Sequence, residues 1–390
     1  MFSRRLPPST AANPLSRAVA ELHARGEAYV DLTDSNPTRA GVEYPPGLLQ
    51  GLADSRALAY EPRPFGLDAA REAVAADAAR RGARVDAAHV VLTASTSEAY
   101  GWLFKLLCNP GERVLVPRPS YPLFEHLTRL EAVEAVPYDL EYHGRWEIAA
   151  GGVARAAADG ARALLVVSPN NPTGSYLTAR ELEAVAAVCA GRGLALVVDE
   201  VFADYRLEAP DGIVTDVAPR AGVLAFTLGG LSKAVGLPQV KLGWIVAGGP
   251  ARERDAALAG LELVADTYLS VSTPVQIAAP GLLASGGVIR DGILRRVAGN
   301  LRALREIAGR WRACDVLPCE GGWSAVIRVP AVRTEDELVL GLLERERILA
   351  HPGYFFDFPR EAFLVVSLLP PPEVFAGAAA RMLQFASLSV

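Results

Sequence analysis

The 390-residue sequence lacks any run of about 18 consecutive apolar residues, the length that a membrane-spanning helix requires. Arg4 and Arg5 are not followed by an apolar stretch, so a secretory signal peptide is not expected. A basic stripe interleaved with aromatic side chains is also missing, and the formal net charge is −5. These absences predict a cytoplasmic protein that binds neither a membrane nor nucleic acid.

Metal-binding and nucleotide-binding patterns are missing as well. Among the four scattered cysteines only Cys314 and Cys319 lie close together, and no second pair completes a zinc site, so no metal is expected. A nicotinamide dehydrogenase would need a G-x-G-x-x-G motif between a strand and a helix. The nearest candidate, GRGLAL at 191–196, lacks the third glycine and precedes a predicted strand.

What the sequence does contain is an alternation of apolar runs and helical segments. Helical spacing is found at 13–26, 67–82 and 178–193. Between such segments lie near-continuous apolar runs, which are typical of strands buried on both faces. These predicted strands cover residues 89–95, 113–119, 162–170, 194–200, 223–229 and 242–248. The alternation predicts an α/β domain with a mainly parallel sheet.

The pattern changes after about residue 280. Helical segments near 288–310 and 334–347 alternate with apolar segments at 321–330 and 363–372, and a final helix follows. This arrangement predicts a smaller α+β domain. We therefore assign residues 40–282 to a large domain, and residues 1–39 with 283–390 to a small one.

Three predicted strands end in residues with distinctive chemistry. SPNNPTG (168–174) provides amides, Asp199 and Glu200 provide carboxylates, and GGLSK (229–233) provides the amine of Lys233. Because ligands bind beyond the carboxyl ends of parallel strands, we expect these groups to share one crevice. Taken singly, each also fits a structural role, as a turn, a helix cap or a solvated lysine.

In these motifs the sequence resembles the aspartate-aminotransferase-like pyridoxal phosphate (PLP) enzymes of fold type I, class I/II. The resemblance covers nearly the whole chain, and its most specific segments are SPNNPTG (168–174), DEVFADY (199–205) and LSKAVGLPQVKLGW (231–244). It implies the PLP-transferase fold, with the cofactor bound by the large domain, and a homodimer with shared active sites.

The resemblance implies roles for the residues at the strand ends. Lys233 would form a Schiff base with PLP, because only a primary amine makes an imine that a substrate amine can displace. Asp199 would keep the pyridine nitrogen protonated. Asn171 would hydrogen-bond the phenolic oxygen of the ring, and Tyr121 would stack on the ring face. Phosphate would lie at the start of a helix, held by Ser95, Thr96, Ser97, Ser232 and Lys241, together with Tyr60 of the neighbouring subunit.

Three positions depart from the residues that are usual in the family. Lys241 stands in place of an arginine, and Phe202 in place of a tyrosine that hydrogen-bonds the phenolic oxygen. Tyr205 is a candidate to replace that tyrosine. The largest departure is Val365, which aligns with the arginine that binds the α-carboxylate of the substrate. Either the substrate lacks that carboxylate, or another cation takes over.

Arg39 is the first candidate for the replacing cation, and Ser35 of the same loop is a further candidate substrate residue. Arg63 and Arg328 are weaker candidates, expected to be surface residues. The aromatic segment HPGYFFDFP (351–359), with Tyr354 as a candidate substrate residue, forms either core packing or an apolar wall for a hydrophobic substrate.

The expected function is transamination by a ping-pong exchange between an amino donor and a keto acceptor. A lyase or decarboxylase on the same fold would use Lys233, Asp199 and Asn171 in the same way, and product analysis distinguishes the two. A non-catalytic regulator with this fold would carry a DNA-binding domain, for which the segment before Ser35 is too short.

Overall fold

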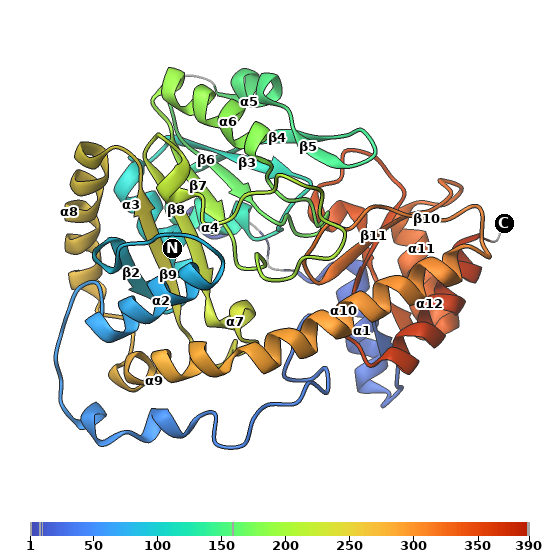
Figure 1. Cartoon of the computed structure of the whole chain (residues 1–390). Helices are drawn as coiled ribbons and strands as arrows, with labels where there is room; N and C mark the ends of the chain where they lie inside the picture. Colours follow the sequence, from blue (N-terminus) through green and yellow to red (C-terminus); the bar gives the residue numbers. More distant parts are fainter. Residues whose placement is uncertain (1, 8, 10, 158–159, 388–390) are drawn as a thin grey trace.

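The computed structural model describes residues 2–7, 9, 11–157 and 160–387. Two sheets organise the chain, one of eight strands and one of four (Figure 1). We call the part built on the larger sheet, residues 60–285, the large lobe. The part built on the smaller sheet, residues 287–387 together with residues 14–35, is the small lobe. A short parallel pair, β1 (Val30–Asp31) with β12 (Ile348–Leu349), joins the N-terminal segment to the small lobe.

The large sheet has the order β2-β9-β8-β7-β6-β3-β4-β5. The run from β8 to β4 is parallel, whereas β9 is antiparallel to both of its neighbours and β5 is an antiparallel edge. The prediction of a mainly parallel sheet is therefore confirmed. The strands are β2 (Val90–Thr93), β3 (Arg113–Arg118), β4 (Glu134–Tyr142), β5 (Trp146–Ile148), β6 (Ala161–Val167), β7 (Ala195–Asp199), β8 (Ala225–Gly230) and β9 (Gly243–Gly248).

Helices cover both faces of this sheet, which explains the apolar runs of its strands. In β7, Val197 packs with α3 and α8, and the next residue, Val198, packs with α2, α6 and α9 on the other face. Successive strand residues point to opposite faces, so both must be apolar when both faces are covered. The helices are α2 (Asp68–Arg80), α3 (Thr96–Leu107), α4 (Phe124–Leu130), α5 (Ala150–Ala156), α6 (Ala179–Arg192), α7 (Leu231–Ala234), α8 (Ala251–Tyr268) and α9 (Thr273–Ser285).

The small sheet is antiparallel, in the order β10-β11-β14-β13, and its two faces differ. Ile327 and Leu364 pack against the helices of the small lobe, whereas Val326 and Val365 belong to the core of the large lobe. Its strands are β10 (Asp315–Val316), β11 (Ser324–Arg328), β13 (His351–Pro352) and β14 (Phe363–Ser367). Its helices are α1 (Pro14–Ala24), α10 (Gly287–Ala308), α11 (Glu335–Gly341) and α12 (Pro372–Ser387).

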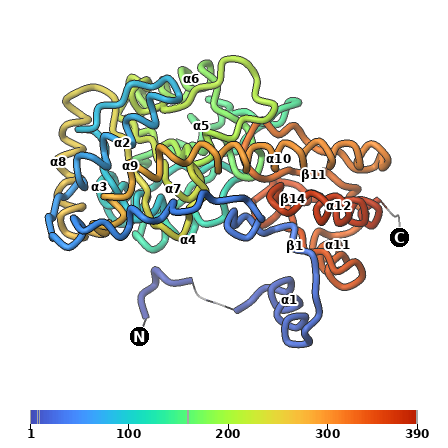
Figure 2. The backbone as a smooth tube through the Cα atoms, turned by 60° about the horizontal axis from the view of Figure 1, so that its bottom comes forward, coloured from blue at the N-terminus to red at the C-terminus, as the bar shows by residue number. Residues whose placement is uncertain are grey.

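Short helical turns complete the chain. They are η1 (Gln50–Ala53), η2 (Ser55–Leu58), η3 (Ala87–His89), η4 (Ala218–Arg220), η5 (Leu342–Glu346) and η6 (Gly353–Phe356). Figure 2 shows α1 beside α11, and the segment between β1 and α2 running along the outside of the large lobe next to α9. The long helix α10 extends from the large lobe across the small one (Figure 1).

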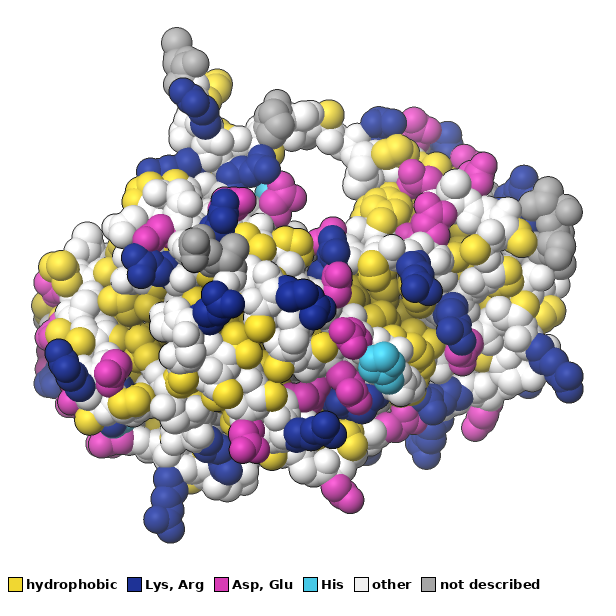
Figure 3. Space-filling view, turned by 90° about the horizontal axis from the view of Figure 1, so that it is seen from above, with side chains coloured by type: hydrophobic (Ala, Val, Ile, Leu, Met, Phe, Trp, Pro, Cys, Tyr) yellow, Lys and Arg dark blue, Asp and Glu magenta, His cyan; other side chains and the backbone are white. Residues whose placement is uncertain are grey.

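Within the described residues, no single helix is long and apolar enough to cross a membrane, although α9 and α10, bent by 57° at their junction, pass that test as a pair. On the face in Figure 3, Lys and Arg side chains are interspersed with Asp and Glu side chains.

Candidate active site

A cavity of about 200 Å³ lies where β6, β7 and β8 end, and both lobes line it. Asn171, Asp199 and Lys233 all line it, so the three strand ends do meet in one crevice. The residues expected from the sequence that line the cavity are Ser35, Thr96, Ser97, Tyr121, Asn171, Asp199, Ser232 and Lys233.

Lys233 lies in α7, the short helix that directly follows β8. Its Nζ is 4.7 Å from the ring centroid of Trp323 and 5.4 Å from that of Phe202. Burial lowers the pKa of this amine to about 8, while the Asp199 carboxylate opposes the shift. Because the uncharged amine is the nucleophilic form, Lys233 is reactive at a pH well below that of an exposed lysine.

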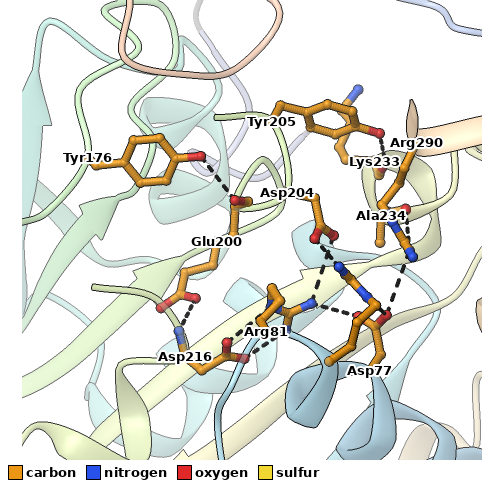
Figure 4. A network of polar contacts seen from close by, with 12 residues as sticks. Asp77, Arg81, Tyr176, Glu200, Asp204, Tyr205, Asp216, Lys233, Ala234 and Arg290 are labelled. Atoms are coloured by element: carbon orange, nitrogen blue, oxygen red, sulfur yellow. Dashed lines mark hydrogen bonds and ion pairs between the residues drawn. The ribbon is translucent and has the colours of Figure 1, made fainter. Parts of the chain in front are cut away.

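Three side chains from distant segments fix the backbone around Lys233. The Tyr205 hydroxyl donates to the Lys233 carbonyl oxygen at 2.5 Å, and Arg290 donates to the Ala234 carbonyl oxygen at 3.1 Å (Figure 4). The Tyr44 hydroxyl donates to the Gly236 carbonyl oxygen at 2.7 Å. Sequence reasoning missed these anchors, because each is a contact to backbone across a long sequence separation.

Tyr205 therefore does not replace the tyrosine that is missing at Phe202. Its hydroxyl is engaged by the Lys233 carbonyl, its ring is fully buried against Trp323, and it does not line the cavity. Phe202 does line the cavity and brings no hydroxyl.

Asp199 is buried at the end of β7 and holds two hydrogen bonds. The Tyr100 hydroxyl donates to Oδ2 and the Val201 backbone N–H donates to Oδ1, both at 3.1 Å. Burial raises the pKa of Asp199 to about 6, and both hydrogen bonds and Lys233 oppose that shift. The carboxylate is consequently ionised at neutral pH and suited to pair with a cationic ring nitrogen.

Glu200, the next residue, does not line the cavity, and its side chain points toward Asp216 in a buried ionic network (Figure 4). It accepts a hydrogen bond from the backbone N–H of Asp216, whose carboxylate pairs with Arg81 at 2.7 Å. Arg81 also pairs with Asp77 at 2.6 Å, and Asp77 lies 3.7 Å from Arg290, the residue that holds the lysine helix. Glu200 thus belongs to the support of the site and not to its lining.

Asn170 and Asn171 differ in the same way, because within the described residues only Asn170 has its side chain engaged in hydrogen bonds. The Asn170 amide donates to Ser120 Oγ at 3.1 Å, and its oxygen accepts from the Thr173 hydroxyl at 3.0 Å. Asn171 lines the cavity, and its side chain makes no hydrogen bond to the described residues. Its amide is therefore available to a ligand.

The other end of the cavity is the N-terminus of α3. The Ser95 side chain caps the helix by accepting from the Glu98 N–H at 3.1 Å, while Thr96 and Ser97 line the cavity. Gly243 of β9 lets the backbone approach this turn, since an added Cβ there would lie only 3.0 Å from the Thr96 nitrogen. Free N–H groups at a helix start, with the helix dipole, form a site for a phosphate.

Five expected residues lie outside the cavity lining, and one of them is Ser95, whose side chain caps α3. Lys241 and Arg39 are exposed, and Tyr60 is exposed by 77%. The Tyr354 hydroxyl donates to Asp336 at 2.6 Å, and Phe356 of the same segment lines the cavity instead.

The remaining arginine candidates are surface residues, as expected. Arg63 pairs with Glu61 and Arg328 pairs with Asp315. Val365 lines the cavity, and among the described residues no arginine does so.

These features fit pyridoxal phosphate. A phosphate-binding helix start, an unengaged amide, a buried carboxylate and a lysine of lowered pKa surround one cavity, with the Tyr121 ring beside them. The Ser120 N–H also donates to the Phe356 carbonyl oxygen at 3.0 Å, which ties the small lobe to the edge of the site.

Comparisons with known proteins agree with this geometry. An alanine aminotransferase of Mycobacterium tuberculosis (strain ATCC 25618 / H37Rv) is 28% identical over 395 residues, covering 95% of this chain and 89% of that protein. The glutamate-pyruvate aminotransferase AlaA of Escherichia coli (strain K12) is 25% identical over 378 residues, covering 91% of this chain and 90% of that protein.

Solved structures share the fold. The alanine aminotransferase from Pyrococcus furiosus superposes with a TM-score of 0.88 at 22% identity, covering 99% of both chains. A double mutant of the Thermus thermophilus aspartate aminotransferase gives a TM-score of 0.85 at 22% identity, also covering 99% of both chains. Residues 33–377 match the family model described as aminotransferase class I and II. The chain therefore belongs to the class I and II aminotransferases and is a pyridoxal phosphate-dependent transaminase.

Proposed function

We propose that this enzyme transfers an amino group from an α-amino acid to a 2-keto acid in a ping-pong cycle, with Lys233 as the residue that binds the cofactor covalently. When bound, pyridoxal phosphate supplies an aldehyde that accepts the amino group and a ring that withdraws electrons from the α-carbon. The observation that carries the proposal is the meeting of Lys233, Asp199 and Asn171 in one cavity.

Each of these residues has a distinct task. The Lys233 amine would move a proton to and from the α-carbon, for which its pKa of about 8 is close to neutral pH. Asp199, ionised at neutral pH, would hold a proton on the ring nitrogen. Asn171 would donate to the phenolic oxygen, and Tyr121 would support the ring face. The phosphate would be held by the backbone of Thr96 and Ser97 at the start of α3 and by Ser232, which line the cavity. Ser95 would contribute by capping that helix start, and exposed Lys241 would add charge from the periphery.

The donor and acceptor are proposed from the relatives and the cavity. Two relatives carry the names alanine aminotransferase and glutamate-pyruvate aminotransferase. Trp323 and Phe356 line the cavity from the small lobe and would bound the space for the substrate. Alanine and glutamate, with pyruvate and 2-oxoglutarate as the corresponding acceptors, are the first substrates to test. The Ser35 hydroxyl lines the same cavity and is proposed to contact the substrate; Arg39 and Tyr354, outside it, are not.

We further propose a homodimer in the cytoplasm, with the two domains divided as the sequence predicts. Tyr60 does not line the cavity of its own chain, and its exposure leaves it free to reach the site of a second copy.

The test is an absorbance titration of the purified enzyme with L-alanine, L-glutamate, an aromatic amino acid and a simple amine, followed by product analysis. Transamination predicts that an α-amino acid converts the cofactor to its aminated form and yields the matching 2-keto acid. A decarboxylated amine or an eliminated fragment as the product would instead establish a lyase or decarboxylase on the same fold.

A further inference from the structure

One face of the small sheet presents a set of side chains to the cavity. Ser324 of β11 lies directly across from Ser367 of β14, and His351 of β13 lies directly across from Val365 of β14. Directly opposed residues of an antiparallel pair share a face, as do residues two apart on one strand. All four side chains therefore point the same way, and all four line the cavity. With Trp323 they form what we call the small-lobe wall.

Two nitrogen atoms of this wall are buried without a partner. Among the described residues, Trp323 Nε1 and His351 Nδ1 have no hydrogen-bond partner. Trp323 is only 2% exposed, and both residues line the cavity. A buried polar atom in a folded protein is normally hydrogen-bonded, so an acceptor at this wall would pair with the Trp323 N–H and, in the tautomer that carries its proton on Nδ1, with the His351 N–H.

The wall has donors but no fixed charge. Lys233 is the only lysine or arginine among the described lining residues. Burial lowers the pKa of His351, with Asp31 opposing, so the imidazole is uncharged at neutral pH and carries one N–H. A group with several acceptor atoms, such as a carboxylate, is the complement of converging N–H and O–H donors.

The position of His351 explains how it can serve such a group. Its ring is packed between Phe355 and Phe356, with ring centroids 5.4 and 5.7 Å away, which fixes its orientation. Its strand neighbour Val365 is short and apolar, so the space in front of position 365 stays open to the imidazole.

We propose that His351 and Trp323, with the hydroxyls of Ser324 and Ser367, bind the α-carboxylate of the amino donor in place of an arginine at position 365. The inference rests on the proposed function, in which the donor is an α-amino acid. His351 in β13 would then hydrogen-bond the carboxylate, which the apolar side chain of Val365 in β14 cannot do.

The test compares a donor with and without the carboxylate. L-alanine and L-alaninamide share their amine and side chain, and the rate of cofactor amination is measured for each as a function of concentration. In His351→Leu we expect the ratio of kcat/KM for alanine to that for alaninamide to fall ~10- to 100-fold, mostly through the KM of alanine, because a hydrogen bond to a charged group is lost. L-glutamate and its α-amide serve as the second pair.

Two further variants separate recognition from packing. Trp323→Phe keeps an aromatic ring but removes the N–H, and it should shift the ratio in the same direction. His351→Asn keeps a donor near the Nδ1 position and should recover part of the loss. Phe358→Leu is the matched control: this buried ring of the same segment packs against Trp146 and Phe363 and does not line the cavity, so the ratio should stay within about threefold of wild type.

The outcomes distinguish an error in the role of the small-lobe wall from an error in the choice of donor. Equal losses of kcat/KM for alanine and alaninamide, or an unchanged ratio in His351→Leu and Trp323→Phe, would overturn the proposed role of the small-lobe wall. The proposal that the enzyme is an amino-acid transaminase would not be affected by either result. If wild type reacts only with amines that lack a carboxylate, the α-amino acid donor itself is wrong.

Discussion

Lys233 and Asp199 are both removed from water, and burial moves their pKa values toward each other. The pKa of the Lys233 amine falls to about 8 and the pKa of the Asp199 carboxyl group rises to about 6, because each group loses the hydration that stabilises its charge. Both groups therefore titrate close to neutral pH, where a proton can be exchanged without a large free-energy change.

A single missing hydroxyl at Phe202 is expected to alter the titration of the bound cofactor. A tyrosine there would donate to the phenolic oxygen and stabilise the deprotonated form, so Phe202→Tyr should shift the cofactor's spectral transition to lower pH than in wild type. An absorbance titration between pH 5 and pH 10 measures this shift, which we expect to be about one unit. Coincident titration curves would show that position 202 does not influence the cofactor.

At the residue scale the sequence predicts which residues meet in the cavity but not what holds them there. Lys233, Asp199 and Asn171 were predicted from motifs at strand ends, and they meet in the cavity. Tyr100 and Arg290 could not be predicted, since they act across separations of 99 and 56 residues. No local spacing encodes a contact of that kind.

At the scale of elements, burial decides which strands the sequence reveals. The six predicted strands are covered on both faces and read as apolar runs, and all six are present. β4 was not predicted, because its residues alternate between buried and exposed and include charges. The reversed direction of β9 was not predictable either, since side-chain periodicity is the same for both directions.

The short helix α7 depends on side chains outside itself, and this dependence can be measured. Tyr205→Phe removes the donor to the Lys233 carbonyl and should lower the free energy of unfolding by about 1–3 kcal/mol. It should also reduce kcat and weaken cofactor retention, because the lysine is held less firmly. Denaturant unfolding and steady-state kinetics provide the readouts.

Tyr176→Phe is the control for that experiment. Tyr176 is equally buried, and its hydroxyl donates to the Ala203 carbonyl oxygen at 3.0 Å, away from the lysine helix. It should lose comparable stability but keep its kcat and cofactor. Similar kinetic losses in both variants would mean that general stability, and not the anchoring of α7, limits activity.

At the scale of the whole molecule, the cavity is shared between two lobes and, we propose, between two chains. Mixing Tyr60→Phe subunits with Lys233→Ala subunits tests whether two chains share each site. In a hybrid dimer, one site would combine Lys233 of the first chain with Tyr60 of the partner subunit, so cofactor binding of wild-type affinity should return in up to half of the sites. If Tyr60 served its own chain, no hybrid site would contain both residues and affinity would stay low.

The central claim is that Lys233 holds the cofactor, and the chain makes it easy to test because it contains only three lysines, Lys105, Lys233 and Lys241. The enzyme with its bound cofactor is reduced with borohydride, which makes the bond to a lysine permanent, then digested and mapped by mass spectrometry. We expect the added cofactor mass on the peptide that contains Lys233 and on neither of the peptides that contain Lys105 and Lys241. Attachment at Lys105 or Lys241, or no attachment in an enzyme that retains pyridoxal phosphate, would contradict it.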